Sequence, residues 1–153
     1  MKLSHGENVG IKFASWDKKD GLEVPRDCYN SYIYLPEDTE ISIPDKFQMH
    51  GKPFSDMADG GSALHLNLSQ LPDADFFYWL RCLAGKYGTT YWTTNVLETC
   101  CNDCGWNDFR TLDTCPKCGS KNLSFASRII GYLRKIENYS EGRKIEHSKR
   151  FYH

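Results

Sequence analysis

The chain of 153 residues is long enough for one compact domain, with room for a small metal-bound segment. Its 19 basic and 20 acidic side chains give a net charge of -1, which argues against nucleic-acid binding by blanket phosphate neutralisation and against a polybasic membrane anchor. No apolar run approaches the ~20 residues that a membrane helix needs. Residues 1–6 lack the apolar core of a signal peptide, so we expect a cytoplasmic protein.

The first third of the chain is polar and offers few regular elements. Residues 1–30 are rich in turn-forming residues. Residues 29–35 are rich in β-forming residues and predict a strand. Residues 40–43 alternate between polar and apolar, which predicts a second short strand that Pro44 ends. The stretch 47–58 is expected to be irregular.

A half-buried strand and the clearest helix follow. Leucines alternate with polar residues over 63–68, a pattern typical of a strand with one buried face. Pro72, followed by acidic residues, fits a helix start, and Gly85 or Gly88 is expected to end that helix. Residues 89–94 are β-branched and aromatic, which predicts another strand.

These elements indicate an α+β chain without an internal repeat. Aromatic residues make up 14% of the sequence but are scattered, so the first half shows no clear core of its own. A small domain with a modest core and a segment that leans on another chain would both have this composition.

Five of the seven cysteines lie close together, which favours a metal site over a disulfide framework. Two CxxC pairs, Cys101 with Cys104 and Cys115 with Cys118, are separated by ten residues. Each pair can turn two thiolates toward one ion, and four thiolates complete a tetrahedral shell for Zn²⁺. The spacing therefore predicts a zinc ribbon with these four ligands.

The alternatives to zinc are a redox pair and an iron–sulfur cluster. A redox pair needs one CxxC and no second, so it is disfavoured, whereas four cysteines could also hold a cluster. Cys100 could replace Cys101, but the doubled CxxC register favours Cys101. Gly105 and Gly119 each follow a second cysteine, where a tight turn often needs positive φ. A closed site of four thiolates has no open position, so a structural role is expected.

The segment after the ribbon contains Arg-Ile-Ile-Gly-Tyr-Leu, centred on Gly131. Alone, a glycine between apolar residues usually marks a bulge or turn. Together with the CxxCG and CPxCG wording of the ribbon, with 139–144 and with a basic, helix-like end, the segment resembles the C-terminus of anaerobic (class III) ribonucleotide reductase. There the Arg-hydrophobic-x-Gly-Tyr element is the glycyl radical loop. The resemblance implies that Gly131 is the radical residue and Tyr132 its motif neighbour.

The resemblance extends upstream to about residue 25, through residues 30–31, 60–61 and 87–95. It implies an α+β fragment, namely the last part of a glycyl-radical-enzyme α/β barrel followed by a four-cysteine zinc ribbon and a glycyl radical loop. The domains implied are the C-terminal barrel portion, the ribbon, and the radical loop with its tail, at 1–98, 99–125 and 126–153.

Glycine suits a stored radical for a physical reason. Removal of a Cα hydrogen leaves an electron that delocalises onto the adjacent amide and carbonyl only if Cα is planar, and glycine has no side chain to oppose this. The radical must also be shielded, and the apolar neighbours Ile129, Ile130 and Leu133 fit a loop tucked inside a larger protein. Oxygen would cleave the backbone at the radical, so anaerobic conditions are implied.

The resemblance also implies partners. A large N-terminal chain would supply the cysteine that becomes a thiyl radical and share the ribonucleoside triphosphate substrate. A separate activating enzyme with an iron–sulfur cluster would use S-adenosylmethionine to generate the radical. Outside the ribbon, Cys82 is expected to be a buried structural thiol on the helix, and Cys28 is more plausibly a bystander than a redox residue.

Two explanations fit a chain this short. It could be the radical-bearing subunit of a reductase split into two genes, as in some phages, working then in the host cytoplasm. It could also be a stand-alone spare part that replaces a damaged radical loop, and the reductase-like upstream strands favour the first reading. A third reading from another class is a non-enzymatic zinc-ribbon module that binds nucleic acid or protein, which the near-neutral charge disfavours.

Overall fold

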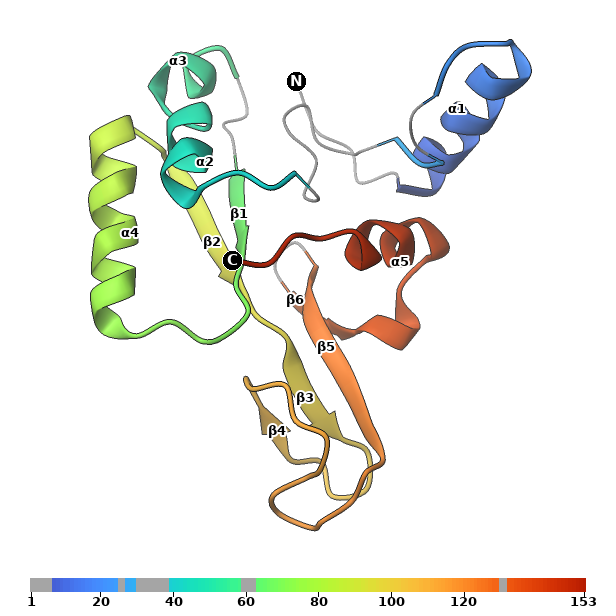
Figure 1. Ribbon diagram of the computed structural model, residues 1–153, viewed down its shortest axis with the longest axis vertical. Helices are drawn as coiled ribbons and strands as arrows, with labels where there is room; N and C mark the ends of the chain where they lie inside the picture. Colours follow the sequence, from blue (N-terminus) through green and yellow to red (C-terminus); the bar gives the residue numbers. More distant parts are fainter. Residues whose placement is uncertain (1–6, 25–26, 30–38, 59–62, 130–131) are drawn as a thin grey trace. The chain divides into compact units, whose positions relative to one another are not determined.

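The computed structural model of the chain describes residues 7–24, 27–29, 39–58, 63–129 and 132–153. The chain forms two units, which are described separately (Figure 1). The first unit comprises residues 1–40 and 139–151, and the second comprises 41–138 with 152–153. Within the described part of the chain, no helix combines the length and apolarity needed to cross a bilayer.

The first unit is built on two helices that contact each other, α1 (Glu7–Lys19) and α5 (Glu141–Ser148). Small residues of α1 face inward: Ala14 is fully buried, and a Cβ added at Gly10 would overlap the carbonyl of Tyr29. The prediction of a turn-rich N-terminus is therefore wrong for α1. Its helical apolar stripe is exposed, and it consists of Val9, Phe13 and Trp16.

A buried ion cluster stabilises α5. Nη1 of Arg143 donates to both carboxylate oxygens of Glu146, at 2.8 and 3.0 Å, and Nη2 of Arg150 donates to Oε1 of Glu146 at 3.3 Å. Both guanidinium groups are almost completely buried. Arg150, at the basic end of the chain, is therefore not on a solvated face, because its charge is neutralised within the fold.

The second unit begins with a β–α–β arrangement. Strands β1 (Ala63–Asn67) and β2 (Tyr91–Asn95) pair in parallel, and α4 (Ala74–Tyr87) connects them. Helices α2 (Ile43–Met49) and α3 (Lys52–Ser55) precede them in the chain, and α2 packs against β1 and α4 (Figure 1). Both predicted strands and the predicted helix are confirmed.

This arrangement has a hydrophobic core of its own, so the first half of the chain does not depend on another chain for every buried contact. The core side chains come from α2, β1, the residue after β1, and α4, and they are Ile43, Phe47, Leu64, Leu66, Leu68, Leu80 and Leu83. Trp92 of β2 packs against this cluster, with its ring centroid 5.9 Å from that of Phe47.

Residues 40–58 differ from the sequence-based prediction. Pro44 does not end a strand but lies in the first turn of α2, where its missing N–H has no intrahelical partner to lose. Ser42 caps the helix, since its hydroxyl accepts from the backbone N–H of Asp45 at 3.3 Å. The segment expected to be irregular contains the rest of α2 and all of α3.

Helix α4 begins and ends with side-chain and glycine caps. Asp73 accepts a hydrogen bond from the N–H of Phe76 at 2.8 Å, and Gly88 ends the helix in a left-handed conformation with φ +71. The inner face carries Leu80 and Leu83. Cys82 is exposed, so the prediction of a buried thiol is wrong: this position lies off the stripe that packs on the core.

The rest of the second unit is a four-stranded antiparallel sheet in the order β4-β3-β5-β6. Its strands are β3 (Glu98–Cys101), β4 (Asn107–Asp108), β5 (Leu123–Ile129) and β6 (Tyr132–Lys135). A 3-10 helix, η1 (Ile136–Asn138), follows β6. The strand predicted at 29–35 falls almost entirely outside the described residues.

Candidate metal centre

Two similar turns present the four cysteines of the sheet. In the first, the N–H of Gly105 donates to the carbonyl of Cys101 at 3.0 Å, and in the second the N–H of Gly119 donates to the carbonyl of Cys115 at 2.8 Å. Both glycines have positive φ, +70 and +73, a conformation that glycine adopts without steric penalty. The predicted role of these glycines is confirmed.

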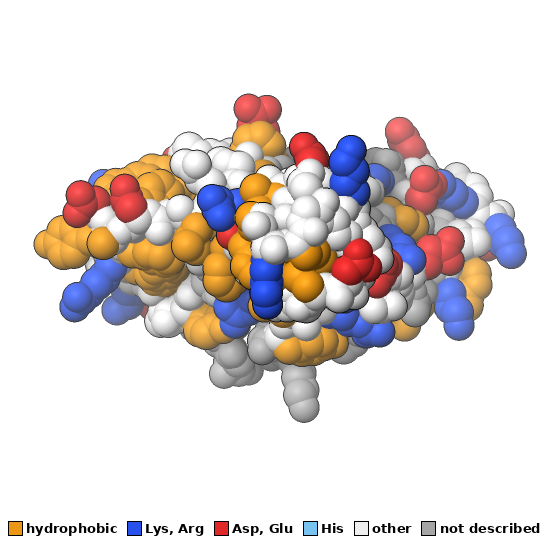
Figure 2. Space-filling model, turned by 90° about the horizontal axis from the view of Figure 1, so that it is seen from below, with side chains coloured by type: hydrophobic (Ala, Val, Ile, Leu, Met, Phe, Trp, Pro, Cys, Tyr) orange, Lys and Arg blue, Asp and Glu red, His pale blue; other side chains and the backbone are white. Residues whose placement is uncertain are grey.

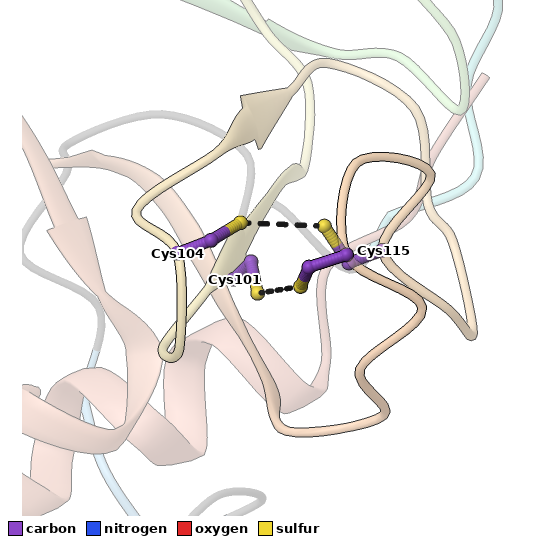
Figure 3. A group of neighbouring side chains, drawn as sticks. Cys101, Cys104 and Cys115 are labelled. Carbon is purple, nitrogen blue, oxygen red and sulfur yellow. Dashed lines mark hydrogen bonds between the residues drawn. The ribbon is translucent and has the colours of Figure 1, made fainter.

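The four sulfur atoms converge on one point (Figure 3). All lie within 4.8 Å of one another; Sγ of Cys101 is 3.6 Å from Sγ of Cys118, and Sγ of Cys104 is 3.7 Å from Sγ of Cys115. A tetrahedral ion with Zn–S bonds of ~2.3 Å would place its sulfur ligands about 3.8 Å apart. The site therefore fits a single tetrahedral ion, whereas a multi-iron cluster would spread its cysteine ligands further.

The thiols influence one another's ionisation. The pKa of Cys101 is lowered to about 7, chiefly because the backbone N–H of Cys104 donates to its sulfur. The backbone N–H of Ser120 lowers the pKa of Cys118, but contacts with the neighbouring thiols and desolvation outweigh it and raise this pKa to about 12. One thiol of the cluster therefore ionises readily, whereas ionisation of another is disfavoured by its neighbours. A divalent cation would stabilise the thiolate form of all of them.

Side chains outside the cysteines tie the two turns together. The carboxylate of Asp103, in the first turn, accepts hydrogen bonds from the hydroxyl of Ser120 and from Nδ2 of Asn122, the latter at 2.7 Å. These donors lower the pKa of Asp103, so the carboxylate stays ionised. Nδ2 of Asn102 also donates to Oδ1 of Asn122, at 3.1 Å. Such outer contacts hold metal ligands in place.

Cys100 does not join the four sulfurs. It lies within β3 opposite Ser124 and Asn107, and desolvation by burial raises the pKa of its thiol. The structure therefore groups the cysteines in the register that the doubled CxxC motif predicts.

The strands on either side of Gly131 belong to the same sheet. Gly131 itself lies outside the described residues, but the pairing of β5 with β6 continues up to Ile129 and Tyr132. Arg128 of β5 donates a hydrogen bond from Nη1 to the hydroxyl of Thr93 on β2. Leu133, which was expected to shield the loop, is 50% exposed in this chain, and Tyr132 is 56% exposed.

Cys28, the other cysteine considered for chemistry, is half-buried in the first unit. Its thiol contacts the carbonyl of Tyr29 at 3.4 Å. It belongs to a different unit from the four-cysteine cluster.

Sequence analysis missed a buried asparagine pair at the ends of the parallel strands. Nδ2 of Asn95 donates to Oδ1 of Asn67 at 3.2 Å, and both side chains are almost completely buried. Oδ1 of Asn95 has no hydrogen-bond partner among the described residues. The available signal was an asparagine near the end of each predicted strand, Asn67 within 63–68 and Asn95 directly after 89–94, at the edge of a parallel sheet where ligands often bind.

A family model and solved structures point to the same protein family. Residues 5–153 match the family model described as anaerobic ribonucleoside-triphosphate reductase. No curated protein sequence gives a significant match.

The solved structures most relevant to the fold are anaerobic ribonucleotide reductases. One, with that title, superposes with a TM-score of 0.80 at 24% identity, over 97% of this chain and 24% of its own. Another, from Thermotoga maritima in complex with dATP and CTP, gives a TM-score of 0.71 at 23% identity, over 95% of this chain and 23% of its own. The chain therefore shares their fold but spans only about a quarter of their length.

Proposed function

Since the chain belongs to the anaerobic ribonucleoside-triphosphate reductase family, we propose that it is the C-terminal, glycyl-radical-bearing subunit of such an enzyme, with the radical on Gly131. The observation that carries the proposal is the family match over residues 5–153, which includes the four-cysteine cluster and the Arg-Ile-Ile-Gly-Tyr segment. The pairing of Ile129 with Tyr132 supports it, because two paired strands flank the radical position. A glycine there permits the planar Cα that delocalises the electron.

The four-cysteine cluster would hold a structural Zn²⁺ through Cys101, Cys104, Cys115 and Cys118. The tetrahedral spacing of the sulfur atoms and the absence of a fifth ligand group among the described residues favour this assignment. The ion would supply no reaction chemistry. It would fix the turns that end β3 and precede β5, and β5 leads directly to the radical segment.

The reaction would be divided between two chains. A radical-SAM activating enzyme, with its own iron–sulfur cluster and S-adenosylmethionine, would remove a Cα hydrogen from Gly131. The radical would pass to a cysteine of the large chain, and the resulting thiyl would abstract the 3′ hydrogen of a ribonucleoside triphosphate. The 2′ hydroxyl would leave as water and a reductant, formate or a thiol protein, would supply two electrons. This chain holds the radical, and the large chain holds the thiyl cysteine.

Exposed apolar surface supports the need for a large partner. Figure 2 shows hydrophobic side chains gathered on the side of α4, where Phe77, Tyr78 and Trp79 are exposed. Tyr132 and Leu133 are exposed beside the radical position. Contiguous apolar surface of this kind marks interaction sites, and the relatives of known structure have about three-quarters of their length outside the part that matches.

The spare-part reading remains the second candidate. A replacement loop would need only the radical segment and its support, whereas this chain also carries the β1–α4–β2 arrangement with its own core. That surplus favours the split reductase. Thiolate ligands persist in reducing compartments, so we place the complex in the cytoplasm, that of the host if a phage encodes it.

Electron paramagnetic resonance tests the proposal. The chain, a large reductase chain and the activating enzyme are incubated anaerobically with S-adenosylmethionine, and a doublet from the single remaining Cα hydrogen is expected. The doublet should be absent in Gly131→Ala. If no doublet forms and the chain instead binds DNA with strong salt dependence, the zinc-ribbon binding module is the better reading.

A further inference from the structure

Asn102 connects the first cysteine turn to the two strands that flank the radical position. Its Oδ1 accepts a hydrogen bond from the hydroxyl of Ser124 on β5 at 3.0 Å and from Nζ of Lys135 on β6 at 2.6 Å. Its backbone N–H donates to the carbonyl of Asn122 at 3.0 Å, and its Nδ2 donates to Oδ1 of the same residue. One side chain thus contacts β5, β6 and the segment before β5.

The position of Asn102 depends on the cysteines that surround it. It lies directly after Cys101 and two residues before Cys104, within the turn whose two sulfurs face the metal position. An ion that holds both sulfurs would fix this turn and with it the direction of the Asn102 amide. Without the ion, the turn is held by weaker contacts, and the Asn102 side chain is less firmly directed toward β5 and β6.

Lys135 makes the contact informative, because it lies at the far end of β6 from Gly131. Its backbone pairs with Ala126, and its ammonium group also contacts Glu137 at 3.9 Å. The bond from Lys135 to Asn102 therefore ties the base of the hairpin to the cysteine turn. At the other end of the hairpin, Arg128 is tied to Thr93 of β2.

We propose that Asn102 is a positioning residue through which metal binding at the four cysteines orders β6, the strand that follows Gly131 in the sequence. The inference rests on the proposed function for the role of Gly131, but the coupling between metal and β6 stands on the contacts alone. Asn102 accepts from a charged donor, and charge-assisted hydrogen bonds are stronger than neutral ones.

Hydrogen–deuterium exchange on the full chain tests the coupling directly. With Zn²⁺ bound, Asn102→Ala is expected to speed amide exchange in β6 about five- to tenfold, since a hydrogen bond of this kind contributes on the order of one power of ten in the opening equilibrium. Exchange in β1 and β2 should stay unchanged. Asn107→Ala, at an exposed asparagine on the neighbouring strand β4, is the matched control and should leave β6 as in the unaltered chain.

Metal removal supplies the second arm. Chelation should speed β6 exchange in both chains, because the β3–β6 sheet loses stability without the ion, but by a smaller factor in Asn102→Ala, where the link is already cut. Asn102→Asp keeps the acceptor for Lys135 and Ser124 but loses the Nδ2 donor to Asn122, so its β6 exchange should be slower than in Asn102→Ala without reaching that of the unaltered chain. If Asn102→Ala retains Zn²⁺ and β6 exchanges as in the unaltered chain, the inference is overturned.

Two further outcomes separate this inference from the proposed function. If Asn102→Ala fails to hold Zn²⁺, Lys135→Met decides, since it removes the same bond without touching the cysteine turn; slow β6 exchange in that variant overturns the inference. If the unaltered chain gives no doublet with its partner and activase, the proposed function fails while the exchange result stands. A doublet of reduced intensity in zinc-loaded Asn102→Ala, beside a full one in Asn107→Ala, supports both.

Discussion

Arg128 on β5 donates a hydrogen bond to the hydroxyl of Thr93 on β2, and this contact joins the strand before Gly131 to the parallel sheet. The two residues are 35 positions apart in the sequence. The antiparallel sheet that carries the cysteines and the parallel pair β1–β2 are therefore linked by side chains as well as by the short connection from β2 to β3.

Thr93→Val should weaken this link while preserving side-chain shape. We expect the free energy of unfolding to fall by about 1–2 kcal/mol, because a charged donor loses its acceptor. Denaturant titration measures the change, with Thr94→Val as the neighbouring control. In a double-mutant cycle with Arg128→Met the two effects should be strongly non-additive, and additive effects would show that the contact contributes nothing.

Cys115→Ser should release the metal, because Cys115 is a buried member of the four-sulfur cluster. We expect bound zinc to drop from one ion per chain to a small fraction, with a large loss of thermal stability in the β3–β6 sheet. Metal analysis and circular dichroism during heating provide the measurement. Cys100→Ser is the control, since this thiol lies outside the cluster and its replacement should leave zinc in place.

The same variant tests the link between metal and radical. With the large chain and activase, Cys115→Ser should give no doublet from Gly131. A normal radical yield in a zinc-free variant would show that the ribbon and the radical segment are independent.

Two glycines near the ends of helices should respond in opposite directions to alanine. At Gly51 a Cβ would lie 2.5 Å from the carbonyl oxygen of Tyr87 and 2.9 Å from that of Gln48, so backbone must move. We expect Gly51→Ala to destabilise the second unit by more than about 2 kcal/mol. Gly85 lies inside α4 with open space around its Cβ position, so Gly85→Ala should raise the free energy of unfolding by about 0.5–1 kcal/mol. Equal effects at both positions would contradict the close approach of Gly51 to the carbonyl of Tyr87.

The elements that the sequence predicted share one property: their signals are local. The alternation in β1, the caps of α4 and the CxxC turns are each determined by residues that are close together in the sequence. Pro44 was misread because a proline fits both the end of a strand and the first turn of a helix. The cap formed by Ser42 and Asp45 decides between the two, and that cap is a contact of the folded chain.

The parts that the sequence could not predict depend on distant pairs. Asn102 with Lys135, Arg128 with Thr93 and Asn95 with Asn67 are separated by 33, 35 and 28 positions. Asn102 and Arg128 lie within sequence motifs, but no motif specifies these contacts, because strand order and register decide which residue each side chain meets. α1 was missed for another reason: its apolar stripe is exposed, and only small residues face inward.

His50 predicts a pH dependence of stability. Burial at the end of α2 lowers its pKa from 6.5 to about 4, with smaller contributions from the charges of His65 and Lys46. Between pH 6.5 and 4 the unfolded chain binds a proton that the folded chain does not, so stability rises with pH across this window. The stabilisation is complete above pH 6.5 and is lost as the pH falls, by about 2 kcal/mol at pH 5 for one group.

The difference between the unaltered chain and His50→Gln isolates this residue, because metal release at low pH affects both. Urea titrations at pH 7 and pH 5 should show a smaller loss of stability in the variant. His153, whose pKa burial also lowers to about 4, retains its own contribution, so the slope should decrease without vanishing. If the variant and the unaltered chain lose the same stability between pH 7 and pH 5, the pKa of His50 is not lowered by folding.

Exposure to air after activation gives the most direct chemical test of the radical position. Oxygen adds to a carbon-centred radical, and the resulting peroxyl chemistry cleaves the backbone at that carbon. We expect mass spectrometry to detect two fragments that divide the chain at Gly131, in proportion to the doublet intensity before exposure. Gly131→Ala, treated identically, should stay intact, because the alanine side chain opposes the planar Cα. Scission at another glycine, such as Gly105 or Gly119 beside the cysteines, would show that the radical forms at that residue instead of at Gly131. An intact chain after a strong doublet would show that the radical is on the partner.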